Sequence, residues 1–67
     1  MEFLTIKEQK VLLKLKEYNT TCIDFNLTSK GDVADYIGVK RPNLYKYLEI
    51  LTKKGYINYI NNTITFN

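Results

Sequence analysis

Two glycines and one proline divide the second half of the chain into helices. Gly38 follows a short apolar face with helical spacing, and Pro42 opens the next such run, which ends near Lys54 with Gly55 behind it. Glycine takes the left-handed conformation that ends a helix, and proline at the first helical position loses only an N–H without a partner. With Ser29 as a cap, this predicts two helices joined by a tight turn. Their apolar positions are Val33, Ala34 and Ile37, then Leu44, Leu48 and Leu51.

A capping box begins an earlier helix. Thr5 and Glu8 have the spacing at which each side chain accepts from the other residue's backbone N–H. The apolar spacing behind them predicts a helix from about Ile6 to Tyr18. Asn19-Thr20-Thr21 should end it, because these side chains compete for backbone hydrogen bonds.

Two segments alternate apolar and polar residues as strands do. The first lies between the first two helices and predicts a short, half-buried strand with Ile23, Phe25 and Leu27 on its apolar face. In the second, Asn61-Asn62 can supply the positive φ angles of a two-residue hairpin turn. Folding about that turn pairs Ile57 with Phe66, Tyr59 with Ile64 and Ile60 with Thr63. Such a hairpin is not stable alone, so its apolar face should cover the helices.

The composition argues against an enzyme. The 67 residues include no His and a single cysteine, Cys22. No disulfide can form within the chain, and the default general base near neutral pH is missing. Asp32 and Asp35 stand at a helix start, where capping explains them better than catalysis. We expect one domain over residues 1–67, without a catalytic site, metal, cofactor or small-molecule ligand.

The sequence carries no signal for export or for membrane insertion. Acidic residues stand near the start, where a signal peptide has positive charge. No apolar run approaches the ~20 residues that cross a membrane. We therefore expect a cytoplasmic protein.

The net charge of +3 arises in one stretch. Residues 40–54 sum to +4 and the rest of the chain to −1. A local basic patch predicts a surface that binds a polyanion, and a solvated helix face is the alternative. The charged residues of the stretch are Lys40, Arg41, Lys46, Lys53 and Lys54, with Glu49 opposing them.

Residues 32–44 resemble the helix-turn-helix motif of transcription regulators. Ala34 is small where the following helix crosses, Gly38 lets the chain turn, and Leu44 enters the groove between the helices. The continuation through Lys53-Lys54-Gly55 into a strand-turn-strand is similar to the winged helix-turn-helix subgroup, and the likeness covers nearly the whole chain. It implies an α+β fold of three helices with a C-terminal β-hairpin wing and a short strand between helices one and two.

The resemblance also implies which residues meet DNA. In helix-turn-helix proteins the second helix of the motif enters the major groove, and its N-terminal residues reach base edges. Arg41 can pair with guanine or a phosphate, and Asn43 with adenine. The helix entrance at Ser29-Lys30 and Lys40 suits phosphate contacts. The predicted DNA-binding residues are Ser29, Lys30, Lys40, Arg41, Pro42, Asn43, Tyr45, Lys46, Asn61 and Asn62.

The wing departs from the family pattern. Its tip, Ile60-Asn61-Asn62-Thr63, lacks the Arg or Lys that such wings commonly insert in the minor groove. Asparagine can read an A·T-rich minor groove, and a plain tight turn is the simpler explanation.

These observations favour a small sequence-specific regulator of transcription that binds double-stranded DNA and represses by occupying its operator. One alternative is a winged-helix module that binds proteins, since tyrosine is enriched at interfaces. Another is an accessory factor in replication or recombination. Single-stranded nucleic acid binding through Tyr45-Lys46-Tyr47 is a further alternative, although helix geometry explains that run.

Apolar residues outside the predicted core suggest a homodimer. Ile50 lies about 240° round its helix from Leu44, at about 100° per residue. It should contact thymine methyl groups, another chain, or a first helix that wraps further than the pattern indicates. Other apolar residues without a predicted partner surface are Met1, Phe3, Leu4 and Ile6.

Overall fold

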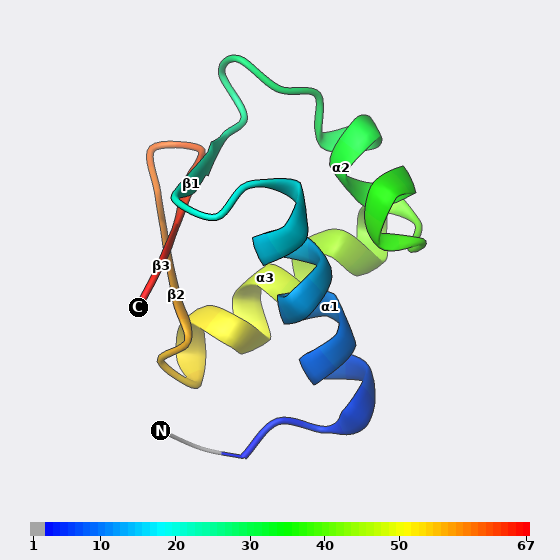
Figure 1. The fold of residues 1–67 in the computed structure, drawn as a ribbon, viewed down its shortest axis with the longest axis vertical. Coiled ribbons are helices and arrows are strands. Elements are labelled where there is room, and N and C mark those ends of the chain that lie inside the picture. The colour runs from blue at the N-terminus through cyan, green and yellow to red at the C-terminus, as the bar shows by residue number, and fades with distance from the viewer. Residues whose placement is uncertain (1–2) are drawn as a thin grey trace.

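The computed structural model describes residues 3–67, so the prediction for Met1 lies outside the described residues. Three helices are followed by an antiparallel hairpin, the α+β layout expected of a winged helix (Figure 1). The elements are α1 Ile6–Tyr18, β1 Cys22–Asp24, α2 Lys30–Ile37, α3 Arg41–Lys53, β2 Ile57–Ile60 and β3 Thr63–Phe66. None of the helices in this part of the chain is long and apolar enough to cross a membrane.

Helix α1 begins and ends where the sequence predicts. The Thr5 backbone N–H donates to Glu8 Oε1 at 3.0 Å, and the Glu8 N–H donates to Thr5 Oγ1 at 3.2 Å. These two bonds complete the capping box. At the other end, Asn19 Oδ1 accepts from the Thr21 N–H at 3.0 Å, so the side chain competes for backbone donors as expected.

Helices α2 and α3 follow the glycine and proline signals. Ser29 caps α2 by accepting from the Asp32 N–H, and Gly38 ends it with a left-handed φ of 86°. Helix α3 begins at Arg41, one residue earlier than predicted, so Pro42 is its second residue. Its missing N–H still costs no bond, because the first four N–H groups of a helix have no intrahelical partner.

Helix α3 ends in a Schellman motif. Gly55, with a φ of 87°, donates its N–H to the Thr52 carbonyl at 3.1 Å. The Tyr56 N–H donates to the Leu51 carbonyl at 3.0 Å. Lys54 is therefore the last residue of the helix turn, and the left-handed glycine follows it. This geometry turns the chain from α3 directly into β2.

The sheet has the strand order β1-β3-β2, with every pair antiparallel. The predicted hairpin register is confirmed, because Tyr59 pairs with Ile64 and Ile60 with Thr63. Asn61 and Asn62 have φ values of 54° and 59°, as a two-residue turn with positive φ at both positions requires. The buried Ile64 of β3 lies in the middle of the sheet.

The predicted strand before α2 is wrong beyond Asp24. Strand β1 ends there, and the Asp24 side chain and carbonyl accept from the backbone N–H groups of Asn26 and Leu27 at 2.8 and 3.0 Å. This turn overrides the apolar alternation. Leu27 is consequently 87% exposed, whereas Ile23 within the strand is buried.

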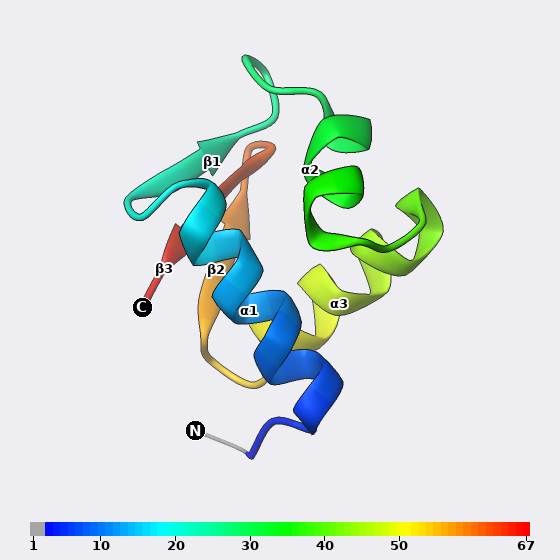
Figure 2. The ribbon, with the colours of Figure 1, turned by 45° about the vertical axis from the view of Figure 1, so that its right-hand side comes forward.

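One buried core joins the helices to the sheet. In both ribbon views the strands lie together on one side, and α3 runs from the end of α2 across to β2 (Figures 1 and 2). Helix α3 packs against α1, α2 and β2. The core residues are Val11, Leu12, Leu15, Ile23, Val33, Ala34, Leu44, Leu48, Leu51, Ile57 and Ile64.

Candidate nucleic-acid interface

The predicted helix-turn-helix unit is formed by α2 and α3. Ala34 and Leu44 are fully buried where the two helices pack, as the small residue and the groove-filling leucine should be. The Val39 N–H donates to the Ala34 carbonyl at 3.0 Å, which closes the turn between the helices. The unit thereby places the start of α3 on the surface with its first residues, Arg41, Pro42 and Asn43, exposed.

Positive charge gathers at the starts of α2 and α3. The Lys30 ammonium lies 5.3 Å from the centre of the Tyr45 ring and 5.8 Å from that of Phe25, so it bridges the loop before α2 and the side of α3. A methyl group at Gly31 would lie 3.4 Å from Ser29 Oγ and 4.0 Å from Arg41 Cδ. The structure therefore brings Ser29, Lys30, Arg41 and Tyr45 together.

Asn43 and Lys46 lie on a different flank of α3. Asn43 is two residues from Arg41, which is about 200° round the helix, whereas Tyr45 is about 40° from Arg41. Asn43 and Lys46 line a hollow of about 330 Å³ together with Lys7. The predicted base-reading residues thus form two groups, one beside α2 and one beside the start of α1.

The same hollow shows what surrounds Ile50, which lies outside the main apolar face of α3. This side chain is half-buried and lines the hollow with Thr5 and Glu8 from the first turn of α1. Helix α1 wraps further around α3 than the apolar pattern indicated, which was one of the three alternatives for this residue. Lys7, which the sequence reasoning did not include among the site residues, borders the hollow.

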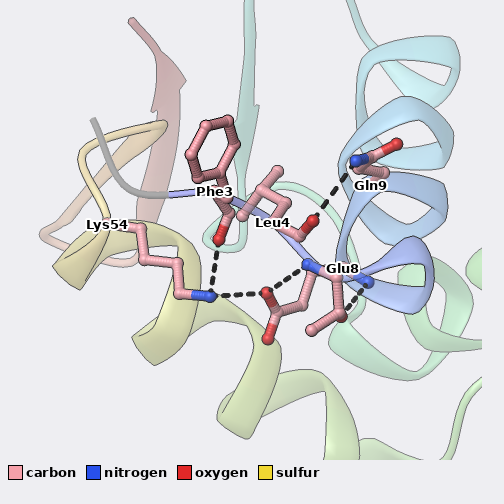
Figure 3. Close-up of polar contacts among 6 residues, drawn as sticks. Phe3, Leu4, Glu8, Gln9 and Lys54 are labelled. Atoms are coloured by element: carbon pink, nitrogen blue, oxygen red, sulfur yellow. Dashed lines mark hydrogen bonds and ion pairs between the residues drawn. The ribbon is translucent and has the colours of Figure 1, made fainter.

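Lys54 is held inside the fold. Its ammonium donates to Glu8 Oε1 at 2.8 Å and to the Phe3 carbonyl at 3.0 Å, tying the end of α3 to the start of α1 (Figure 3). Only 20% of the Lys54 side chain is exposed. Of the charge of +4 in residues 40–54, this ion pair with Glu8 neutralises one, which leaves +3 on residues 40–53.

Glu8 should give the fold a pH dependence. The Lys54 ammonium, followed by the Thr5 N–H, lowers the pKa of the Glu8 carboxyl below its ordinary value of about 4.5. A lowered pKa stabilises the fold above pH 4.5, and the contribution is lost as pH falls through the folded-state pKa. We expect Glu8→Gln to lower the melting temperature by a few degrees at pH 7 and by much less at pH 3.

Thermal unfolding followed by circular dichroism at the two pH values measures this difference. Glutamine keeps an oxygen for the Thr5 N–H, so the variant isolates the charge. Glu49→Gln is the matched control, because Glu49 is exposed and forms no ion pair with residues 3–67. A Glu8→Gln deficit of equal size at pH 7 and pH 3 would contradict the expectation.

The wing tip is anchored to the loop after β1. The Phe25 N–H donates to the Asn62 carbonyl at 2.8 Å, and Asn26 Nδ2 donates to the Asn61 carbonyl at 3.3 Å. Both tip asparagines are exposed. The tip is therefore a short, uncharged turn whose backbone is held by a neighbouring loop, while its two side chains remain accessible.

Among residues 3–67, the remaining cations of this surface have no acidic partner. Within residues 3–67 the ion pairs join Lys14 to Glu17 and Lys54 to Glu8. Lys40, Arg41 and Lys46 are exposed and take part in neither.

Compared with known proteins, the chain matches no family model, no curated protein and no solved structure.

Proposed function

We propose that this protein binds double-stranded DNA in a sequence-specific manner, with the start of α3 in the major groove. The observation that carries the proposal is the convergence of Lys30, Arg41 and Tyr45 where α2 and α3 begin. Helix starts favour anions, and exposed cations that form no ion pair within residues 3–67 are available for phosphates. The buried Ala34 and Leu44 give the two helices the packing that a helix-turn-helix needs.

The residues on the two flanks of α3 should contact different walls of the DNA major groove. Arg41 and Tyr45 face one wall, with Lys30 and the Ser29 cap placed for the adjoining phosphates. Asn43 and Lys46 face the opposite wall, because they lie on the side of α3 that faces α1. Arg41 with guanine and Asn43 with adenine are the pairings that supply base discrimination. Lys40 contributes a phosphate contact at the helix start.

We assign the uncharged wing tip a minor part. Asn61 and Asn62 present amides that can reach the minor groove, but they add no charge and their turn is held by the neighbouring loop. Affinity should therefore come chiefly from α2 and α3. The biological role that fits such a module is transcriptional regulation, in which the bound protein represses by occupying an operator.

A homodimer belongs to this proposal. Phe3 and Ile6 are 96% and 72% exposed, so they leave apolar surface near the start of α1. Two copies joined there would read two half-sites about 10 base pairs apart. The Phe3 carbonyl accepts from Lys54 (Figure 3), so its backbone is held while its side chain stays exposed.

The salt dependence of duplex binding tests the proposal. Fluorescence anisotropy with a labelled duplex should give a slope of log K against log salt of roughly −3 to −5 per protomer, from ~4–5 phosphate contacts. A single-stranded oligonucleotide of the same length should bind more weakly. Absence of binding at 50 mM salt, or tighter binding to the single strand, would overturn the proposal.

A further inference from the structure

A groove runs along α1 on the side that faces the turn between α2 and α3. Its volume is about 560 Å³, within the range of roughly 300–1,000 Å³ that specific ligand sites have. Figure 2 shows α1 in front with this turn beside it. The floor comes from three elements and consists of Val11 on α1, Ile37 and Val39 at the turn, and Tyr47 on α3.

The floor of the groove is apolar, and residues 3–67 leave it partly uncovered. Ile37, Val39 and Tyr47 pack against the core but are only partly buried. Leu13 borders the groove and is 61% exposed, whereas Val11, Leu12 and Leu15 of the same helix are buried. The apolar floor and the exposed leucine beside it offer apolar surface to another molecule.

Lysines form the rim of this floor. Lys7, Lys10 and Lys14 stand at spacings of three and four residues, which puts them on one side of α1. Glu17, 3.3 Å from Lys14, is the opposing charge, so the rim sums to +2. Within residues 3–67 neither Lys7 nor Lys10 has an ion-pair partner.

We propose that this groove binds an acidic amphipathic helix of a partner protein. Its apolar side chains would lie on the floor at Val39 and Tyr47, and its carboxylates would meet the lysines of the rim. This is the helix-in-groove mode, in which apolar anchors recur at i, i+3, i+4 and i+7. The opposite charges speed encounter and reject basic competitors.

Neither DNA nor a second copy of the chain fits the groove as well. DNA offers phosphates for the lysines but nothing apolar for the floor. A second copy carries the same net charge of +3. On its most acidic element, α2, the exposed residues are Asp32, Asp35 and Tyr36, so no row of exposed aliphatic side chains accompanies the carboxylates.

A pair of synthetic peptides tests the proposal on the wild-type protein. One 16-residue peptide has leucines at i, i+3, i+4 and i+7 flanked by glutamates, and its counterpart has lysines in place of the glutamates. Titration followed by ¹⁵N amide shifts should show saturable binding of the acidic peptide with Kd below about 1 mM. The shifts should centre on Val11, Leu13 and Val39, and the basic peptide should bind about tenfold or more weakly.

Two variants sharpen the test. Lys10→Glu/Lys14→Glu should reverse the preference between the peptides, and Leu13→Glu, at an exposed position, should weaken the acidic peptide. Lys16→Glu/Lys53→Glu makes the same charge change outside the groove and should leave the preference as in wild type. Lys7 is kept unchanged because it also borders the hollow beside Asn43.

Three results would overturn the inference while leaving DNA binding by α3 intact. The first is equal binding of the two peptides or no binding of either. The second is a set of shifts centred on Arg41 and Tyr45 instead of the groove. The third is a dimer of the chain alone, seen by sedimentation, whose amide shifts place Val39 and Lys10 in its interface.

Discussion

Replacing Lys30, Arg41 and Lys46 together with glutamine is expected to weaken duplex binding about 100-fold at 100 mM salt. Each substitution removes one contact to a phosphate or base edge, which is worth about 1 kcal/mol or more of binding free energy. The three substitutions together should therefore cost about 3 kcal/mol. The salt slope should become shallower by about 2–3, because fewer counterions are released. Anisotropy titrations at two salt concentrations measure both quantities.

A second triple variant separates this face from simple net charge. Lys10→Gln/Lys14→Gln/Lys16→Gln lowers the charge of the protein by the same amount on α1, at positions outside the proposed DNA-binding residues. It should bind duplex within about threefold of wild type, because the proposal assigns these three lysines no contact to a phosphate or a base and salt screens exposed charges. If the two triple variants lost equal affinity for duplex DNA, the net charge of the protein and not the α3 face would determine binding.

Leu44→Ala should lower the free energy of unfolding by about 2–5 kcal/mol, a large fraction of the total. Leu44 is 0% exposed and sits where α3 packs on α2. Leucine-to-alanine changes in a core cost about 2–5 kcal/mol. A chain of 67 residues has about 3–10 kcal/mol in total, at roughly 0.05–0.15 kcal/mol per residue. Urea unfolding followed by circular dichroism gives the free energy of unfolding.

Leu27→Ala is the matched control for this change. The residue type is the same, but Leu27 is 87% exposed in the turn after β1. Its free energy of unfolding should change by about 0.5 kcal/mol or less. Similar losses at positions 44 and 27 would show that Leu27 belongs to the core, as the apolar alternation of the sequence suggested.

The parts of the fold that the sequence predicted are those decided by residues close together in the chain. The capping box of Thr5 and Glu8, the left-handed Gly38 and the asparagine turn each depend on three or four consecutive positions. The turn then fixes the pairing of Tyr59 with Ile64, because a two-residue loop leaves one register.

The misses have two physical causes. Near Asp24, the side chain accepts from the Asn26 N–H and forms a turn, so the strand ends earlier than the apolar alternation predicts. The ion pair of Lys54 with Glu8 joins residues 46 positions apart, and nothing in the local sequence indicates which cation α1 will meet. A charge sum over a stretch therefore overstates the charge that stays on the surface.

The sequence was used to predict which residues form the candidate site, but it indicated little about how they are arranged around α3. That Arg41 and Asn43 point in different directions follows from helical spacing alone. Which of the two flanks α1 would cover depended on how far α1 wraps around α3, and this is set by tertiary packing. The helical spacing of Lys7, Lys10 and Lys14 on α1 is present in the sequence. It was missed because the net charge of residues 1–29 is zero.

Selection from a random duplex library tests the central claim most directly. Repeated capture at physiological salt should enrich a common motif of about 4–6 base pairs, because a few side chains at the start of one helix read base edges. If two copies bind together, the motif should recur about 10 base pairs away. The Lys30/Arg41/Lys46 glutamine variant should enrich no such motif. A wild-type pool as diverse after selection as before it would contradict sequence-specific DNA binding by α3.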